Sequence, residues 1–147
     1  MSIRTLLTGA LCLACAAALA PAARADQNSA GRAAVLAAYA AQARKADPNF
    51  TGFSAARGEL LYSSRHPQAR RADIQACAAC HGADPTKPGQ NARTGRPIDP
   101  VAVSANPKRF TALDTTEKWF GRNCKEIIGR DCTALEKGDY ITYLQSR

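Results

Sequence analysis

The sequence predicts an all-α domain of about four helices with one long loop. Four segments combine apolar residues at helical spacing with residues that begin or end helices. The loop, over residues 82–107, is rich in proline and glycine and has no periodicity. A C-x-x-C-H motif, Cys77-Ala78-Ala79-Cys80-His81, directly precedes it, and the length of 147 residues suits a single domain.

The first 25 residues have the pattern of a secretory signal peptide. Arg4 supplies the positive start, residues 6–20 are apolar, and Ala23-Arg24-Ala25 is an A-x-A cleavage site. The apolar run of about 15 residues is shorter than the roughly 20 that a membrane span needs. We therefore expect cleavage before Asp26 and a domain over residues 26–147 without a membrane span.

Two helices are expected before the motif. The first covers residues 30–44 and ends at Asp47-Pro48-Asn49, where the chain favours a turn. Ser54 is a suitable N-cap for the second, over residues 55–65. That helix should end at the His66-Pro67 step, because a residue before proline is biased away from helical conformation.

The C-x-x-C-H motif is a signature of covalent haem attachment. The thiols of Cys77 and Cys80 bond to two vinyl groups on one porphyrin edge, and His81 is then held under the iron as its proximal ligand. A redox dithiol does not need the adjacent histidine. A structural zinc site needs a second ligand pair, for which the eight-residue spacing of Cys124 and Cys132 is poor. The motif predicts one covalent haem c.

Two further helices are expected after the loop. Asp114-Thr115-Thr116-Glu117 resembles a capped start, and the third helix would run to residue 128 and stop at Gly129. Thr133-Ala134-Leu135-Glu136 matches a capping box that begins the last helix, which would extend to about residue 145.

Cys124 and Cys132 are the cysteines left over once the signal peptide and the haem motif are set aside. Unpaired thiols are rare in exported proteins, so these two are expected to form a disulfide. On one straight helix they would lie about 12 Å apart, whereas a disulfide allows at most about 7 Å between Cα atoms. The helix must therefore break near Gly129.

The sixth position of the iron has no obvious ligand in the sequence. The only methionine is Met1, which leaves with the signal peptide. His66, a lysine, a vacant position and Asn123 all remain open at this point, although His66 is awkwardly close to the motif. Asn123 lies beside Trp119 and Phe120, whose bulk suits the wall of a haem pocket.

The charge pattern says little about partners. The formal net charge of +8 falls to +6 once Arg4 and Arg24 are removed, and the basic residues are scattered. Aromatic residues do not interleave with them as they do in nucleic-acid binders, so we expect no nucleic-acid partner. A modest positive charge fits docking to an acidic redox partner, and it fits an ordinary solvated surface equally well.

Longer stretches of the chain resemble known families. Gly58-Glu59-Leu60-Leu61-Tyr62 and Tyr140-Ile141-Thr142-Tyr143-Leu144 resemble the terminal helices of class I cytochromes c, which cross closely in that fold. The segments 104–110, 117–124, 129–133 and 136–139 resemble the sphaeroides haem protein family, most specifically in Trp119-Phe120-Gly121-Arg122-Asn123-Cys124.

The resemblance implies a class I cytochrome c-like fold around one haem c and assigns roles to particular residues. Asn123 would bind ferric iron and leave on reduction, which frees a site for O₂, NO or another diatomic ligand. Cys124 and Cys132 would form the nearby disulfide, and His81, Cys77 and Cys80 match the haem attachment. Proteins of this family are reduced by partner cytochromes, including a dihaem c type, so the resemblance implies a redox partner of that kind.

The expected function is therefore electron transfer with redox-gated binding of small diatomic ligands in the periplasm. The alternative is a simple periplasmic electron carrier with no physiological gas ligand. A third possibility is an enzyme that turns over O₂, peroxide or NO. No dedicated acid–base pair and no distal histidine support it, so catalysis is not favoured.

Overall fold

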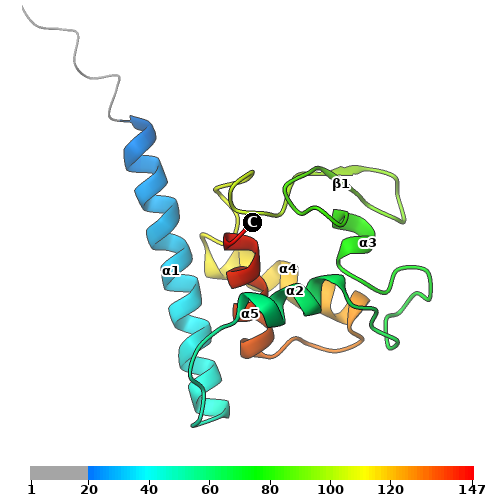
Figure 1. The fold of residues 1–147 in the computed structure, drawn as a ribbon, viewed down its shortest axis with the longest axis horizontal. Helices are drawn as coiled ribbons and strands as arrows, with labels where there is room; N and C mark the ends of the chain where they lie inside the picture. Colours follow the sequence, from blue (N-terminus) through cyan, green and yellow to red (C-terminus); the bar gives the residue numbers. More distant parts are fainter. Residues whose placement is uncertain (1–19) are drawn as a thin grey trace, which may run out of the picture.

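The computed structural model describes residues 20–147, so the first 19 residues of the expected signal peptide lie outside the described residues. The described chain is mostly helical, as the sequence predicts (Figure 1). No helix in this part of the chain is both long and apolar enough to cross a membrane. Its elements are α1 (Ala20–Ala46), α2 (Ala55–Ser63), α3 (Ala78–His81), β1 (Gly89–Gln90), β2 (Pro97–Ile98), α4 (Leu113–Ile127) and α5 (Ala134–Gln145).

The expected caps are confirmed for α2 and α5. The Ser54 side chain accepts a hydrogen bond from the Arg57 backbone N–H at 3.3 Å. Thr133 and Glu136 form both hydrogen bonds of a capping box at the start of α5. These side chains satisfy N–H groups that would otherwise have no partner at the helix ends.

The expected start of α4 is wrong. The helix begins at Leu113, and its N-cap Ala112 has no side chain that could accept a hydrogen bond. Asp114 lies inside the first turn and accepts a hydrogen bond from the N–H of Thr115. In this position the acidic side chain lies next to the positive end of the helix dipole, which stabilises the first turn.

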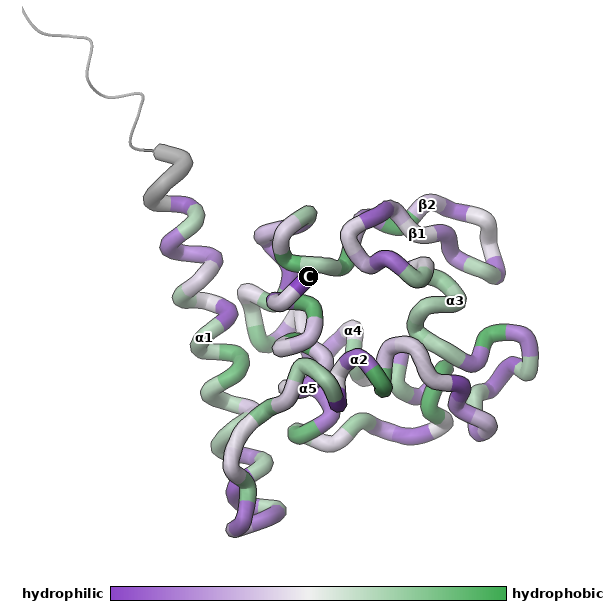
Figure 2. The backbone as a smooth tube through the Cα atoms, viewed as in Figure 1, coloured by the Kyte–Doolittle hydropathy of each residue, from purple (hydrophilic) through white to green (hydrophobic). Residues whose placement is uncertain are grey.

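α1 is longer than the residues 30–44 expected from the sequence, and it runs from Ala20 to Ala46. Alanine has the highest helix propensity, so an alanine-rich segment continues a helix without a periodic apolar face. Figure 2 shows polar and apolar residues alternating along it. Val35, Tyr39 and Ala43 are buried, so one side of α1 packs against the domain.

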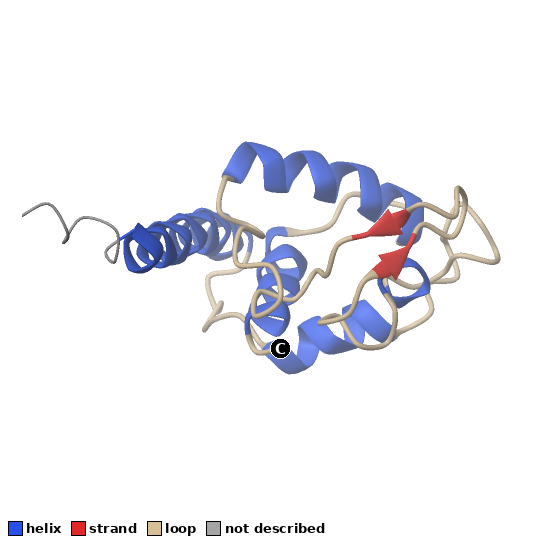
Figure 3. Ribbon diagram, turned by 90° about the horizontal axis from the view of Figure 1, so that it is seen from above, coloured by secondary structure: helices blue, strands red, loops and turns tan. Residues whose placement is uncertain are grey.

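The expected loop contains one short pair of antiparallel strands, in which Gly89 faces Ile98 and Gln90 faces Pro97. These strands and α1 lie on different sides of the molecule, and α1 is seen nearly end-on when the domain is turned (Figure 3). The strand pair therefore gives the loop a fixed shape on the side away from α1.

α2 and α5 cross closely at Gly58, as the resemblance to class I cytochromes c implies. A Cβ atom on Gly58 would overlap the carbonyl group of Asp139, so only glycine permits this approach. The Asp139 carboxylate is 3 % exposed and binds the Ser54 N–H and the Arg57 guanidinium, each at 2.6 Å. The crossing is thus held by backbone contact and by a satisfied buried carboxylate.

Gly58→Ala should lower the free energy of unfolding by about 3 kcal/mol, because the new methyl group forces two backbones apart. Gly121→Ala is the matched control, since a Cβ at Gly121 meets no atom within 4 Å. Chemical denaturation of both variants measures the difference. Equal stability of Gly58→Ala and Gly121→Ala would contradict the close crossing.

Candidate haem-binding site

A cavity of about 530 Å³ lies within the domain and brings the predicted site residues together. Cys77, Cys80 and His81 line it from α3 and the residue before that helix. Four of the remaining predicted residues line it from α4, and Cys132 lines it from the turn before α5; the four are Trp119, Phe120, Asn123 and Cys124. Residues more than forty positions apart in the sequence therefore face one space.

The α3 part of the cavity is held by tight local contacts. α3 is a single turn that ends at Gly82, whose φ of 78° suits glycine. The Tyr62 hydroxyl of α2 donates to the Gly82 carbonyl at 2.6 Å. A Cβ on Gly89 would overlap the carbonyl of Cys80, so the loop after the motif also presses on this turn. The motif is thus fixed from two sides.

The His81 imidazole is available to a ligand. Its Nδ1 atom is buried and has no hydrogen-bond partner among the described residues. The carbonyl of Pro85, in the loop just after the motif, already receives the N–H groups of Val101 and Ala102. Burial, with a smaller contribution from the charge of Arg109, lowers the pKa of His81 to about 4. The ring is therefore neutral near pH 7, the form that binds metals.

Asn123 projects a neutral amide into the cavity from α4. No hydrogen bond among the described residues holds its side chain, so the amide is free to bind a ligand. The buried residues Thr116, Phe120 and Ile127 share its cavity and recur at helical spacing along α4. This face therefore combines one polar donor with an apolar wall.

Cys124 directly follows Asn123 in the chain, and its Cα atom lies 5.6 Å from the Cα atom of Cys132. That separation is within the range a disulfide needs. The turn between them contains Gly129, at a φ of 82°, so the helix breaks where the sequence predicts. Arg130 and Glu136 form an ion pair at 2.7 Å across the same turn, which fixes the C-terminal end of α4.

Part of the cavity wall was not foreseen. The loop supplies Val101 and Arg109, and the Arg109 guanidinium donates to the carbonyls of Asp99 and Pro100 at 2.9 and 3.1 Å. Ile74 precedes the motif, and Tyr140 comes from α5. Loop residues without periodicity give no sequence signal for burial, whereas Tyr140 lies on a recognisable apolar side of its helix.

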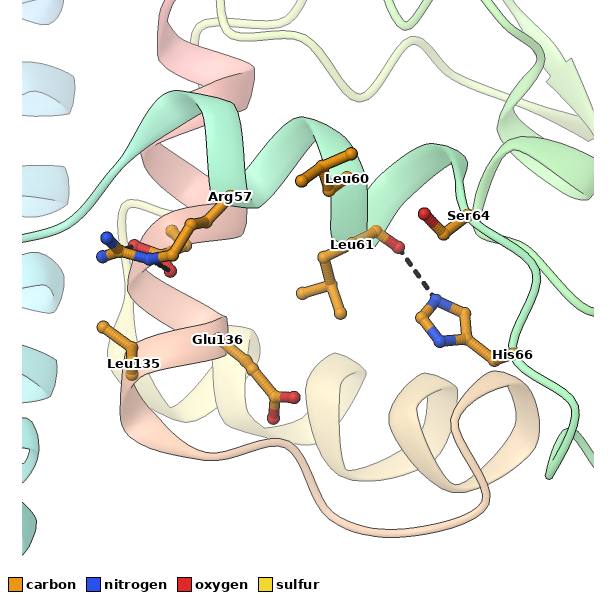
Figure 4. A pocket seen from close by; sticks show the side chains of 8 residues that line it. Arg57, Leu60, Leu61, Ser64, His66, Leu135 and Glu136 are labelled. Atoms are coloured by element: carbon orange, nitrogen blue, oxygen red, sulfur yellow. Dashed lines mark hydrogen bonds and ion pairs between the residues drawn. The ribbon is translucent and has the colours of Figure 1, made fainter.

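His66 lies outside the cavity. It lines a separate surface pocket between α2 and the start of α5, where its Nε2 lies 3.0 Å from the Leu61 carbonyl (Figure 4). The zinc alternative also has no support in the described part of the chain, because no group of three or more potential metal-binding side chains gathers there.

The residues of the cavity fit a covalently bound haem. Two cysteine thiols that form no disulfide stand next to a neutral, unpartnered imidazole, which is what thioether attachment and axial ligation require. The rest of the lining is largely aromatic and aliphatic, as an apolar macrocycle needs. The volume of about 530 Å³ is in the usual range for a cofactor pocket.

Comparisons with known proteins agree with this site. A family model described as a domain of unknown function (DUF1924) matches residues 48–144. The chain is 47 % identical over 93 residues to the Cytochrome c-type protein SHP of Cereibacter sphaeroides, covering 63 % of this chain and 70 % of the relative. It is 36 % identical over 108 residues to Cytochrome c'' of Methylophilus methylotrophus, covering 72 % and 73 %.

Two solved structures are similar over most of the fold. The structure of oxidized SHP, described as an oxygen binding cytochrome c, matches with a TM-score of 0.70 and 42 % identity, covering 79 % of this chain and 96 % of that one. The crystal structure of oxidized cytochrome c'' from Methylophilus methylotrophus matches with a TM-score of 0.68 and 33 % identity, covering 80 % and 94 %.

Replacing both Cys124 and Cys132 with alanine should lower the free energy of unfolding by about 2.5 kcal/mol, the loop-closure value for nine residues. Guanidinium denaturation of the oxidised protein, the reduced protein and the double variant measures the effect. We expect the reduced protein to resemble the variant. A double variant as stable as the oxidised protein would contradict a disulfide at this turn.

Proposed function

Because the chain belongs to the family of c-type cytochromes that includes SHP and cytochrome c'', we propose that it transfers electrons and binds a small diatomic ligand when reduced. Its cofactor is one covalently attached haem c. When bound, this group supplies an iron that alternates between the ferric and ferrous states and accepts diatomic ligands in the ferrous state.

The residues that would hold the haem are side chains of the motif that line the cavity. Cys77 and Cys80 form the two thioether bonds, and the His81 imidazole is the proximal ligand. All three side chains line the same cavity, and neither thiol is engaged in a disulfide. Phe120 is buried and Trp119 is half exposed where they line the α4 side of the cavity, so the two rings would cover that side of the haem.

One observation carries the proposal of ligand exchange. Of the two asparagines that line the cavity, Asn91 has its amide oxygen engaged by backbone N–H groups, whereas that of Asn123 is free. The lining contains no methionine and no histidine besides His81. Besides His81, the lining offers Lys108 as a nitrogen donor, but a lysine must lose its proton before it can bind a metal. A neutral amide has no such requirement.

The chemistry of the amide explains its dependence on redox state. The Asn123 oxygen is a hard, neutral donor that is attracted to a cation mainly by charge, and this attraction weakens when the cation gains an electron. The side chain would therefore bind a ferric iron held by His81 and would release a ferrous one. Its release would leave that position to a small ligand.

The proposed setting is the periplasm, reached through cleavage of the N-terminal signal peptide. The disulfide between Cys124 and Cys132 suits that oxidising compartment. Arg93, Lys108 and Arg122 line the cavity and are exposed, so an acidic redox partner, such as a dihaem c-type cytochrome, would be attracted to this side.

The test is a set of spectra of the haem-loaded protein before and after anaerobic reduction, followed by addition of CO, NO or O₂. We expect the ferric protein to be low-spin and the reduced protein to bind all three ligands. Asn123→Ala should lose the low-spin ferric spectrum and still bind CO when reduced, because only the internal ligand is removed.

Three matched variants make this test specific. Lys108→Ala and His66→Gln remove the rival nitrogen donors, and Lys118→Ala changes an exposed residue of α4 that does not line the cavity. We expect all three to keep the wild-type ferric spectrum. A low-spin spectrum that is lost in Lys108→Ala or His66→Gln would refute Asn123 as ligand. If the reduced protein bound none of the three gases, ligand binding would be refuted and the remaining interpretation would be a simple electron carrier.

A further inference from the structure

Arg32 is a buried charge that the proposed function does not use. It lies on α1 and is 4 % exposed, yet none of the ion pairs among the described residues includes it. Its guanidinium instead donates to two backbone carbonyls, of Pro107 at 2.6 Å and of Arg109 at 3.2 Å. Burying a charge costs free energy, and the two hydrogen bonds offset part of this cost. We therefore ask what the contact holds in place, which is the chain segment that carries the two carbonyls.

The held segment is part of the cavity wall. Lys108, Arg109 and Phe110 all line the cavity, and they follow directly on the first carbonyl that Arg32 binds. The Phe110 ring stacks on Phe120 of α4 at 6.5 Å and meets Tyr140 of α5 edge-on at 6.3 Å. A movement of this segment would therefore move the wall.

The backbone at Phe110 shows independently that the segment is constrained. Phe110 has a φ of 61° and is the only non-glycine residue of the described chain in the left-handed region. Such a conformation persists only where surrounding contacts impose it. Arg32 holds the carbonyl just before Phe110, and Gly31 abuts the residue just after it, because a Cβ on Gly31 would lie 2.5 Å from the Thr111 oxygen.

We propose that Arg32 of α1 is a positioning residue for the haem cavity, which it acts on through the segment 107–111 (the clamped segment). By holding two carbonyls of this segment, Arg32 keeps the Arg109 cation and the Phe110 ring on the cavity wall. α1 lies outside residues 48–144 of the matched family model. The part of the proposal that concerns gas binding rests on the proposed function.

The clamp has two measurable consequences. A fixed positive charge beside the cavity favours the reduced state of a metal within it, so loosening Arg109 should lower the midpoint potential. A fixed Phe110 ring restricts entry to the cavity, so loosening it should make CO combine with the reduced protein several-fold faster.

The experiment compares Arg32→Gln, Arg32→Lys and Gly31→Ala in the haem-loaded protein. Arg32→Gln removes the positive charge and the guanidinium that donates to both carbonyls. Gly31→Ala reaches the same segment by pushing on the Thr111 carbonyl. We expect both to lower the midpoint potential and to speed CO association, and we expect Arg32→Lys to lie between them and wild type. Lys45→Gln, an exposed change in the last turn of α1, should match wild type.

Circular dichroism and thermal unfolding of each variant separate positioning from misfolding. A wild-type potential and wild-type CO kinetics in Arg32→Gln would overturn the proposal, as would changes that appear only in parallel with lost helix content. If wild-type reduced protein bound no CO, the proposed function would fail. The midpoint potential would still decide whether Arg32 positions the wall.

Discussion

At Gly58 the backbones of α2 and α5 touch, and both walls of the haem cavity depend on that contact. From the crossing, α2 carries Tyr62, whose hydroxyl holds the end of α3 through the Gly82 carbonyl. α5 carries Tyr140 into the cavity, where its ring packs against Phe120 at 5.6 Å. A shift at the crossing would therefore alter the position of the attachment motif and of the α4 wall together.

The two walls differ in the strength with which they can hold an iron. The α3 wall carries two thiols that form no disulfide and an imidazole, on a turn whose end the Tyr62 hydroxyl holds. The α4 wall offers one neutral amide at Asn123, on a helix whose end is fixed by the turn at Gly129. Under the proposed function, a strong ligand set on one side and a charge-sensitive donor on the other would let a change of oxidation state open only one side.

Local sequence signals predicted much of this molecule. The caps at Ser54 and Thr133 and the break at Gly129 are each set by one residue type whose chemistry decides the backbone. The close approach at Gly58 was implied by the resemblance to class I cytochromes c. The motif at Cys77, Cys80 and His81 is equally local, and the residues it was expected to meet on α4 do share its cavity.

Other features depend on contacts that no local pattern encodes. α4 begins one residue before its capping signal, and the alanine-rich α1 continues beyond its periodic part. The burial of Arg32 and the left-handed conformation of Phe110 arise because α1 meets a loop some seventy residues away. Nothing in the sequence near either residue indicates that meeting.

Crystal structures of the haem-loaded protein, determined in the ferric state and after reduction within the crystal, test the redox-labile amide most directly. The account predicts the Asn123 oxygen at bonding distance from the iron in the ferric crystal and clearly withdrawn in the reduced one. A nitrogen ligand from Lys108 or His66 opposite His81 in both states would contradict it, and so would an Asn123 that stays bound after reduction.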